Sequence, residues 1–132
     1  MPTKLQLSFA ADTPKGDVIT ICLIGDGGRI VPSLDQDVAA YLIDAMVALK
    51  FTGAAGKTML AYHDRTRYLL VGIGATLNAG KAAENLGGQL FSALADTNAK
   101  RGWLPNHQLD DAVLADICFG AELASYHFDK VL

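Results

Sequence analysis

The sequence has few charged residues and no cluster of basic ones. Charged side chains make up 19% of its 132 residues, and the formal net charge is −3. The nearest approaches to a basic cluster are two pairs, Arg65/Arg67 and Lys100/Arg101. A nucleic-acid-binding surface normally shows a basic face or stripe. The composition therefore argues against DNA or RNA as a partner.

Long apolar runs are also missing. No run approaches the ~18 residues that a membrane-spanning helix needs. The N-terminus lacks the charged segment followed by an apolar segment that marks a secretory signal. We therefore expect a cytoplasmic protein that has no membrane partner.

Cysteine and proline are scarce. The two cysteines, Cys22 and Cys118, each lie inside an apolar segment, which favours buried free thiols over a disulfide or a ligand role. Four prolines against thirteen glycines indicate tight turns and close packing, and not a linker. With 51% hydrophobic residues, the chain can form a core without a disulfide or a structural metal. We predict one domain over residues 1–132.

Hydrophobic periodicity predicts strands and helices that alternate along the chain. Strands are expected over residues 4–9, 17–24, 57–62, 67–73 and 101–104, with a polar hairpin turn at 63–66. Residues 18–23 and 68–73 are almost continuously apolar, as in central strands that are covered on both faces. The order β, β, α, β, β, α, β, α predicts an α/β fold with helices on both faces of a sheet.

Three helices are expected. The first should begin at Ser33, where Gln36 completes a capping box, and end near Gly53. The second should run from Ala79 to Thr97, and the third should start at the Asp110–Asp111 pair, because carboxylates favour a helix N-terminus. The expected apolar faces are Leu34, Val38, Leu42, Ala45 and Leu49; Ala83, Leu86, Leu90 and Leu94; and Val113, Leu114, Ile117, Ala121 and Ala124.

Gly87 and Gly88 stand in the middle of the second predicted helix. Each costs about 1 kcal/mol relative to alanine in a helix. That cost makes sense if the helix lies close on the sheet.

Two glycine-rich segments are incomplete matches to nucleotide-binding motifs. Residues 51–58 resemble a phosphate-binding loop, but Phe51 stands where the first glycine is needed, and the segment follows a helix where that loop would follow a strand. Residues 72–77 follow a strand, as a dinucleotide fingerprint does, but Leu77 replaces its third glycine. Glycine-rich turns that need a positive φ are the simpler interpretation.

No residue qualifies as catalytic, cofactor-binding or metal-binding. The histidines His63, His107 and His127 are not paired with one another or with a cysteine at metal-ligand spacing. No nucleophile elbow of the form Gly-x-Ser-x-Gly is present. The acidic pair Asp110–Asp111 is explained by the start of a helix.

The C-terminal run from Gly120 to Lys130 resembles a family motif. It is similar to the Gly-Ala-x-Leu-Ala-Ser-Tyr-Arg-Phe-Asp-Lys-Tyr segment that ends the first domain of leucyl (cytosol) aminopeptidases, with His127 in place of Arg and Val131 in place of Tyr. Residues 67–74 and 51–58 resemble the same family more loosely. On the helix, Gly120 and Ala124 are expected to allow a close neighbour, and Tyr126 and Phe128 to add apolar surface near its end.

This resemblance implies a three-layer α-β-α sandwich with a mixed sheet, similar to a macro domain. It implies that the parent protein is a two-metal aminopeptidase that removes N-terminal residues and assembles into homo-hexamers. The family's Asn-Thr-Asp-Ala-Glu-Gly-Arg signature has no counterpart in residues 1–132. The expected role is thus an accessory domain, which contacts its own catalytic domain and neighbouring subunits. The two divalent ions, zinc or manganese, are expected in the catalytic domain.

Two alternatives remain. The chain could be a freestanding macro-like module that binds ADP-ribose or a related nucleotide at its glycine-rich loops. It could also be a pure protein-interaction domain.

Overall fold

A computed structural model of the chain describes residues 6–8, 18–30, 34–97, 101–104 and 109–131. In chain order its elements are β1 (Gln6–Ser8), β2 (Ile19–Gly25), β3 (Arg29–Ile30), α1 (Gln36–Ala48), β4 (Thr58–His63), β5 (Thr66–Gly74), α2 (Lys81–Ala95), β6 (Arg101–Trp103) and α3 (Asp111–Val131). The predicted order is confirmed, apart from β3. That strand is only two residues long, too short for a periodic pattern to reveal it.

The strands form one mixed sheet in the order β1-β6-β2-β5-β4, with β3 paired to β2. β1, β6, β2 and β5 are parallel, whereas β4 runs antiparallel to β5. β2 and β5 are both interior strands, and every residue of β2 is buried. The prediction that residues 18–23 and 68–73 form central strands is therefore confirmed.

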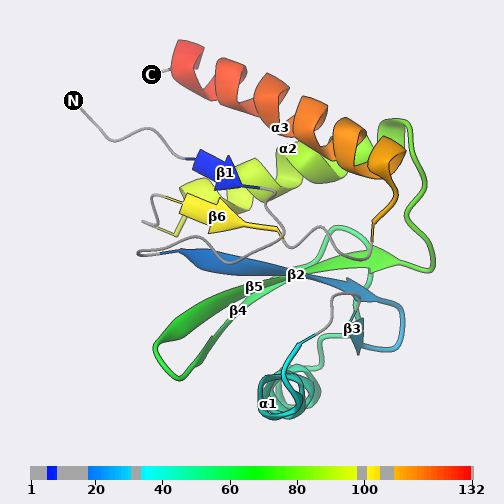
Figure 1. Cartoon of the computed structure of the whole chain (residues 1–132), viewed down its shortest axis with the longest axis vertical. Helices are drawn as coiled ribbons and strands as arrows, with labels where there is room; N and C mark the ends of the chain where they lie inside the picture. Colours follow the sequence, from blue (N-terminus) through cyan, green and yellow to red (C-terminus); the bar gives the residue numbers. More distant parts are fainter. Residues whose placement is uncertain (1–5, 9–17, 31–33, 98–100, 105–108, 132) are drawn as a thin grey trace.

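Helices cover both faces of the sheet, so the fold is the expected three-layer sandwich (Figure 1). α2 and α3 lie on one face, over a core that includes Ile19, Ile21, Leu69 and Val71. α1 covers the other face, over a core that includes Cys22, Ile24, Leu42, Met46, Tyr68 and Leu70. Because side chains alternate along each strand, β2 and β5 supply both cores.

The predicted hairpin is present and is tighter than the sequence suggested. His63 pairs with Thr66, so the loop consists of Asp64 and Arg65 alone. Both loop residues have positive φ, 47° and 66°. This is the φ pattern of a type I′ turn, whose twist matches that of the two strands.

The predicted start of the first helix is wrong. α1 begins at Gln36 with Asp35 as its N-cap, and Asp35 makes no side-chain capping bond, so the helix does not start with Ser33 as the N-cap that we predicted. Ser33 itself lies outside the described residues. Leu49, the last residue of the expected apolar face, is the C-cap and is 66% exposed, whereas Met46, which the expected face left out, is buried. The helix ends at Ala48, about five residues before the expected end near Gly53.

We expected Gly87 and Gly88 to let α2 lie close on the sheet, but the element that approaches α2 closely is the helix α3. A Cβ atom at Gly87 would overlap the carbonyl oxygen of Ile117 on α3. In return, a Cβ at Gly120 on α3 would overlap the carbonyl oxygen of Glu84 on α2. The two glycines thus let the backbones of α2 and α3 touch, as the small residue at position 120 suggested. The side chains of Tyr126 and Phe128 lie outside the described part.

Candidate functional site

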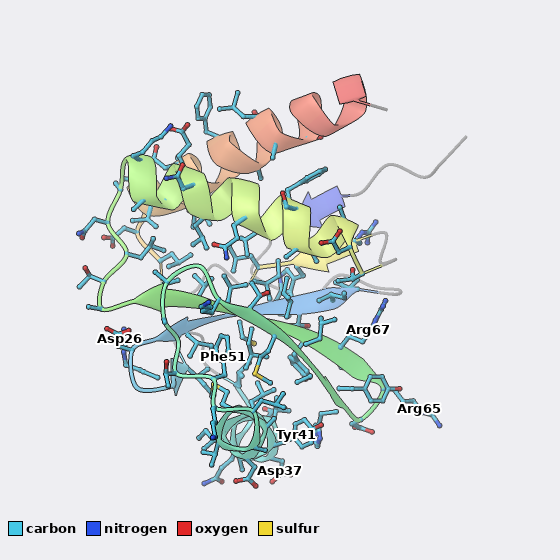
Figure 2. All side chains as sticks on the ribbon, turned by 180° about the vertical axis from the view of Figure 1, so that it is seen from behind. Asp26, Asp37, Tyr41, Phe51, Arg65 and Arg67 are labelled. Atoms are coloured by element: carbon cyan, nitrogen blue, oxygen red, sulfur yellow. The ribbon has the colours of Figure 1, made fainter. Side chains whose placement is uncertain are left out.

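Three glycine-rich loops meet at the carboxyl ends of the parallel strands β2 and β5. They are residues 25–28 after β2, residues 51–57 before β4, and residues 72–76 at the end of β5. In open α/β sheets, ligands usually bind at this end of the strands. Figure 2 marks Asp26 at this end of the sheet and Arg65 at the opposite end, on the tip of the β4–β5 hairpin.

The loops are packed against one another at backbone distance. A Cβ at Gly53 would overlap the carbonyl oxygen of Gly25, and a Cβ at Gly72 would overlap that of Ala54. Gly53 also has a φ of 83°, which a residue with a side chain rarely adopts. Glycine is therefore required at both positions for the fold itself. Of the predicted positive-φ positions in residues 72–77, Gly74 is confirmed at 75°, while Gly72 is explained by the close approach instead.

Several backbone N–H groups of these loops donate hydrogen bonds to carbonyl groups of the same loops. The N–H of Asp26 donates to the carbonyl of Gly74 at 3.0 Å, and the N–H of Gly74 donates to that of Gly53 at 2.9 Å. The N–H of Lys57 donates to the carbonyl of Ala54 at 3.2 Å. A phosphate-binding loop needs free amides that point at the phosphate. Residues 51–57 also lead into a strand, as predicted, so they do not have the context of a P-loop.

A pocket of about 360 Å³ lies beside these loops, under the first half of α2. This is the lower end of the size of ligand pockets. Asn85 and Gln89 of α2 and Thr76 supply its polar side chains, while Ile73, Leu77 and Leu86 supply apolar ones. Asn85 and Gln89 could not be singled out from the sequence, since polar residues on a helix are ordinarily solvent-exposed.

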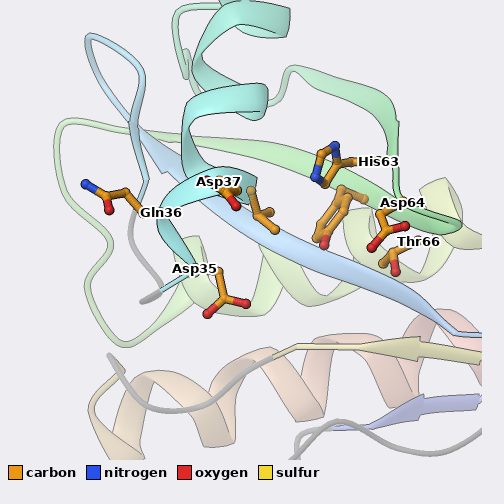
Figure 3. A pocket seen from close by; sticks show the side chains of 8 residues that line it. Asp35, Gln36, Asp37, His63, Asp64 and Thr66 are labelled. Atoms are coloured by element: carbon orange, nitrogen blue, oxygen red, sulfur yellow. The ribbon is translucent and has the colours of Figure 1, made fainter.

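A second pocket, of about 480 Å³, lies between the start of α1 and the β4–β5 turn (Figure 3). Asp35 and Asp37 line it from α1, and His63 and Asp64 line it from the hairpin. The ring of His63 packs against Tyr41 with centroids 4.7 Å apart. Among the described residues, no group of three or more His, Cys, Asp or Glu side chains is arranged to hold a metal ion. The pocket is acidic, but its carboxylates do not converge.

The structure does not bring the histidines singled out in the sequence together. His63 lies on the hairpin, His107 lies outside the described residues, and the side chain of His127 on α3 is likewise not described. Asp110 and Asp111 stand at the start of α3, where the N–H of Leu114 donates to the carbonyl of Asp110 at 2.9 Å. The helix-start interpretation of this acidic pair is confirmed.

Both cysteines are free thiols, as predicted. Burial raises the pKa of Cys22 to about 12, because the thiolate cannot be solvated in the α1 core. Cys118 is only partly buried, which differs from the expectation. Its pKa is raised by the same desolvation and by the neighbouring carboxylate of Glu122. Neither environment resembles that of a reactive cysteine, which needs a lowered pKa.

Among the described residues, large apolar side chains are exposed on α1, on α3 and on β4. Ile43 and Val47 are 48% and 74% exposed on α1, and Phe119 and Leu123 are 51% and 47% exposed on α3. On β4 the exposed apolar side chains are Leu60 and Tyr62. Each helical pair is spaced by four residues, so its members lie on one face. No helix in the described part is long and apolar enough to span a membrane.

Comparison with known families identifies the family of the chain. Residues 23–132 match the N-terminal domain of the cytosol aminopeptidase family. The chain belongs to this family. A comparison with curated proteins finds no match.

Solved structures agree in fold. A mutant of leucine aminopeptidase from tomato matches with a TM-score of 0.65 at 16% identity, over 92% of this chain. At this identity the likeness shows the fold alone. The match covers 28% of the tomato enzyme, so this chain corresponds to less than a third of that protein.

Proposed function

We propose that this chain is the non-catalytic N-terminal domain of a metal-dependent aminopeptidase that removes N-terminal amino acids from peptides. The observation that carries the proposal is the match of residues 23–132 to the N-terminal domain of the cytosol aminopeptidase family. The catalytic domain, with two divalent ions, zinc or manganese, lies outside residues 1–132 in this proposal. The domain itself supplies no catalytic or metal-binding residue.

In this proposal the domain contacts its own catalytic domain and neighbouring subunits of a homo-hexamer in the cytoplasm. Exposed apolar side chains on α1, α3 and β4 support this role. Large exposed apolar side chains that lie together commonly mark surfaces that another protein covers.

The test is a rate measurement on the purified 132-residue chain. We expect no hydrolysis of leucine amide or leucine anilide in the presence of zinc or manganese, with a chelator as control. A two-metal site needs several carboxylates that converge on two ions about 3.5–4 Å apart, and the described carboxylates do not converge. The same domain joined to a catalytic domain of its family should belong to an active enzyme. Metal-dependent turnover that is lost in an Asp110→Asn/Asp111→Asn variant would refute the proposal.

The pocket beside the glycine-rich loops favours a second candidate, a freestanding macro-like module that binds ADP-ribose. Against it stand the loop amides that already donate to backbone carbonyls. Calorimetry decides between the two, and weak or no binding is expected. Micromolar binding that Asn85→Ala or Gln89→Ala abolishes would favour the module. Ser92→Ala, at an exposed position on the same helix, is the matched control.

A further inference from the structure

β4 leaves one edge of the sheet open. In the part of the chain that the structure describes, β4 pairs with β5 alone and ends the strand order. Proteins usually protect such an edge with charged residues, proline or a bulge. The segment Thr58–His63 contains no Lys, Arg, Asp, Glu or Pro, and its register with β5 is regular. The usual protection against pairing with another strand is therefore missing.

The hydrogen-bond pattern shows which residues face the open edge. The N–H of Gly72 donates to the carbonyl of Lys57 at 2.8 Å, so these two residues form a hydrogen-bonded pair. Because such pairs alternate in an antiparallel ladder, Met59, Ala61 and His63 also bond to β5. Thr58, Leu60 and Tyr62 then direct their N–H and C=O groups away from β5, toward the open edge.

The same residues carry exposed apolar side chains. Leu60 is 53% exposed and Tyr62 is 59% exposed. The alternate residues Met59 and Ala61 pack on the α1 core, and the ring contact between His63 and Tyr41 fixes the end of the strand. β4 is thus held firmly against β5 and α1. Its residues Leu60 and Tyr62 combine backbone groups that point to the open edge with exposed apolar side chains.

We propose that β4 pairs with β4 of a second copy of this chain, antiparallel about a two-fold axis at Leu60. In this register Leu60 faces its own copy and Thr58 faces Tyr62. All three outward-directed residues are then paired, with about six intermolecular hydrogen bonds. The two sheets become one continuous sheet across the dimer, and the open edge disappears.

Charge complementarity supports this partner and this register. In the antiparallel arrangement Lys57 at the start of one strand lies opposite His63 of the other, next to the carboxylate of Asp64. This contact occurs twice by symmetry. A shift that places Ala61 on the axis would set Lys57 opposite Arg65, a like-charge pair, and would leave fewer outward residues paired. The β4 edge would be one of the surfaces for the subunit contacts that the proposed function requires, and in this respect the pairing rests on the proposed function.

Sedimentation velocity over about 1–100 µM tests the pairing in the 132-residue chain. We expect a mass that rises with concentration toward twice the 14.0 kDa of the chain. Leu60→Lys sets two like charges face to face on the axis and should weaken dimerisation at least tenfold. Val47→Lys, at a residue that is 74% exposed on α1, is the control and should dimerise normally. A chain that stays monomeric throughout, or a Leu60→Lys variant that dimerises like the original, would overturn the pairing.

Cysteine cross-linking tests the register, in a Cys118→Ser background so that the partly exposed thiol cannot interfere. Leu60→Cys should form an intermolecular disulfide, because facing Cα atoms in a hydrogen-bonded pair are about 5.5 Å apart. Thr58→Cys alone should not, since the two copies of that residue would be about 13 Å apart along the strands. A mixture of Thr58→Cys and Tyr62→Cys should cross-link. Self-cross-linking of Ala61→Cys or Thr58→Cys in place of Leu60→Cys would overturn the register. Peptidase turnover by the chain would overturn the proposed function without affecting either result.

Discussion

Replacing the adjacent glycines of α2 one at a time tests the contact between α2 and α3. Gly87 and Gly88 occupy consecutive positions in the helix interior, so alanine gains about 1 kcal/mol of helix propensity at either. They differ in what a Cβ would meet. At Gly87 it would overlap the carbonyl oxygen of Ile117 and lie 2.8 Å from the nitrogen of Ala121. At Gly88 its nearest atom would be 3.8 Å away, an ordinary contact.

The two substitutions should therefore change stability in opposite directions. Overpacking typically costs about 1–3 kcal/mol, and Gly87 belongs at the upper end because the atoms it would meet are backbone atoms. Subtracting the propensity gain leaves a loss of about 2 kcal/mol for Gly87→Ala and a gain of about 1 kcal/mol for Gly88→Ala. For a domain of this size, 1 kcal/mol corresponds to about 4 °C in Tm. The two variants should melt about 12 °C apart.

Thermal and urea unfolding followed by circular dichroism measure this difference. The dependence on urea should keep its slope in both variants, since neither changes the surface that is exposed on unfolding. Gly120→Ala, which meets the carbonyl oxygen of Glu84 on α2, should behave like Gly87→Ala. A Gly87→Ala variant that melts at or above the temperature of the original chain would show that the two backbones do not touch there.

Three further outcomes follow from single contacts. Arg65→Gly should raise the unfolding free energy by about 0.5–1 kcal/mol, because Arg65 has a φ of 66° in the hairpin turn; a loss in urea unfolding would contradict this. The carboxylate of Asp116 accepts a hydrogen bond of 2.6 Å from the N–H of Gly80 at the start of α2. Asp116→Ala should thus cost about 0.5–1 kcal/mol and Asp116→Asn less, and equal losses would exclude this capping role. Burial raises the pKa of Cys22 from 9.0 to about 12, so the unfolded chain loses this thiol proton first, and stability should fall as pH rises from 9.0 toward 12. Cys22→Ala should flatten that fall, leaving the parts due to Tyr68 and Cys118, whose pKa values are also raised; an unchanged pH profile would argue against a buried thiol.

The sequence by itself determined the layers and the family. The apolar runs at 18–23 and 68–73 indicated strands covered on both faces, because a half-exposed strand alternates apolar and polar side chains. The faces of α2 and α3 followed from helical periodicity, which depends only on 3.6 residues per turn. The run from Gly120 to Lys130 indicated the aminopeptidase family, which the match over residues 23–132 confirms.

The tertiary structure decided which segments lie next to one another and where elements begin. A capping box is a local pattern, yet α1 begins at Gln36, beyond the Ser33 that should have capped it. The sequence showed that Gly87 needed a close neighbour but not whether a sheet or a helix would fill that place. Likewise, Leu60 and Tyr62 lie in a strand of ordinary pattern, and only the sheet order leaves that strand at an edge. Spacing along the chain fixes which residues share a face, whereas the element that covers the face, or leaves it open, depends on contacts between distant segments.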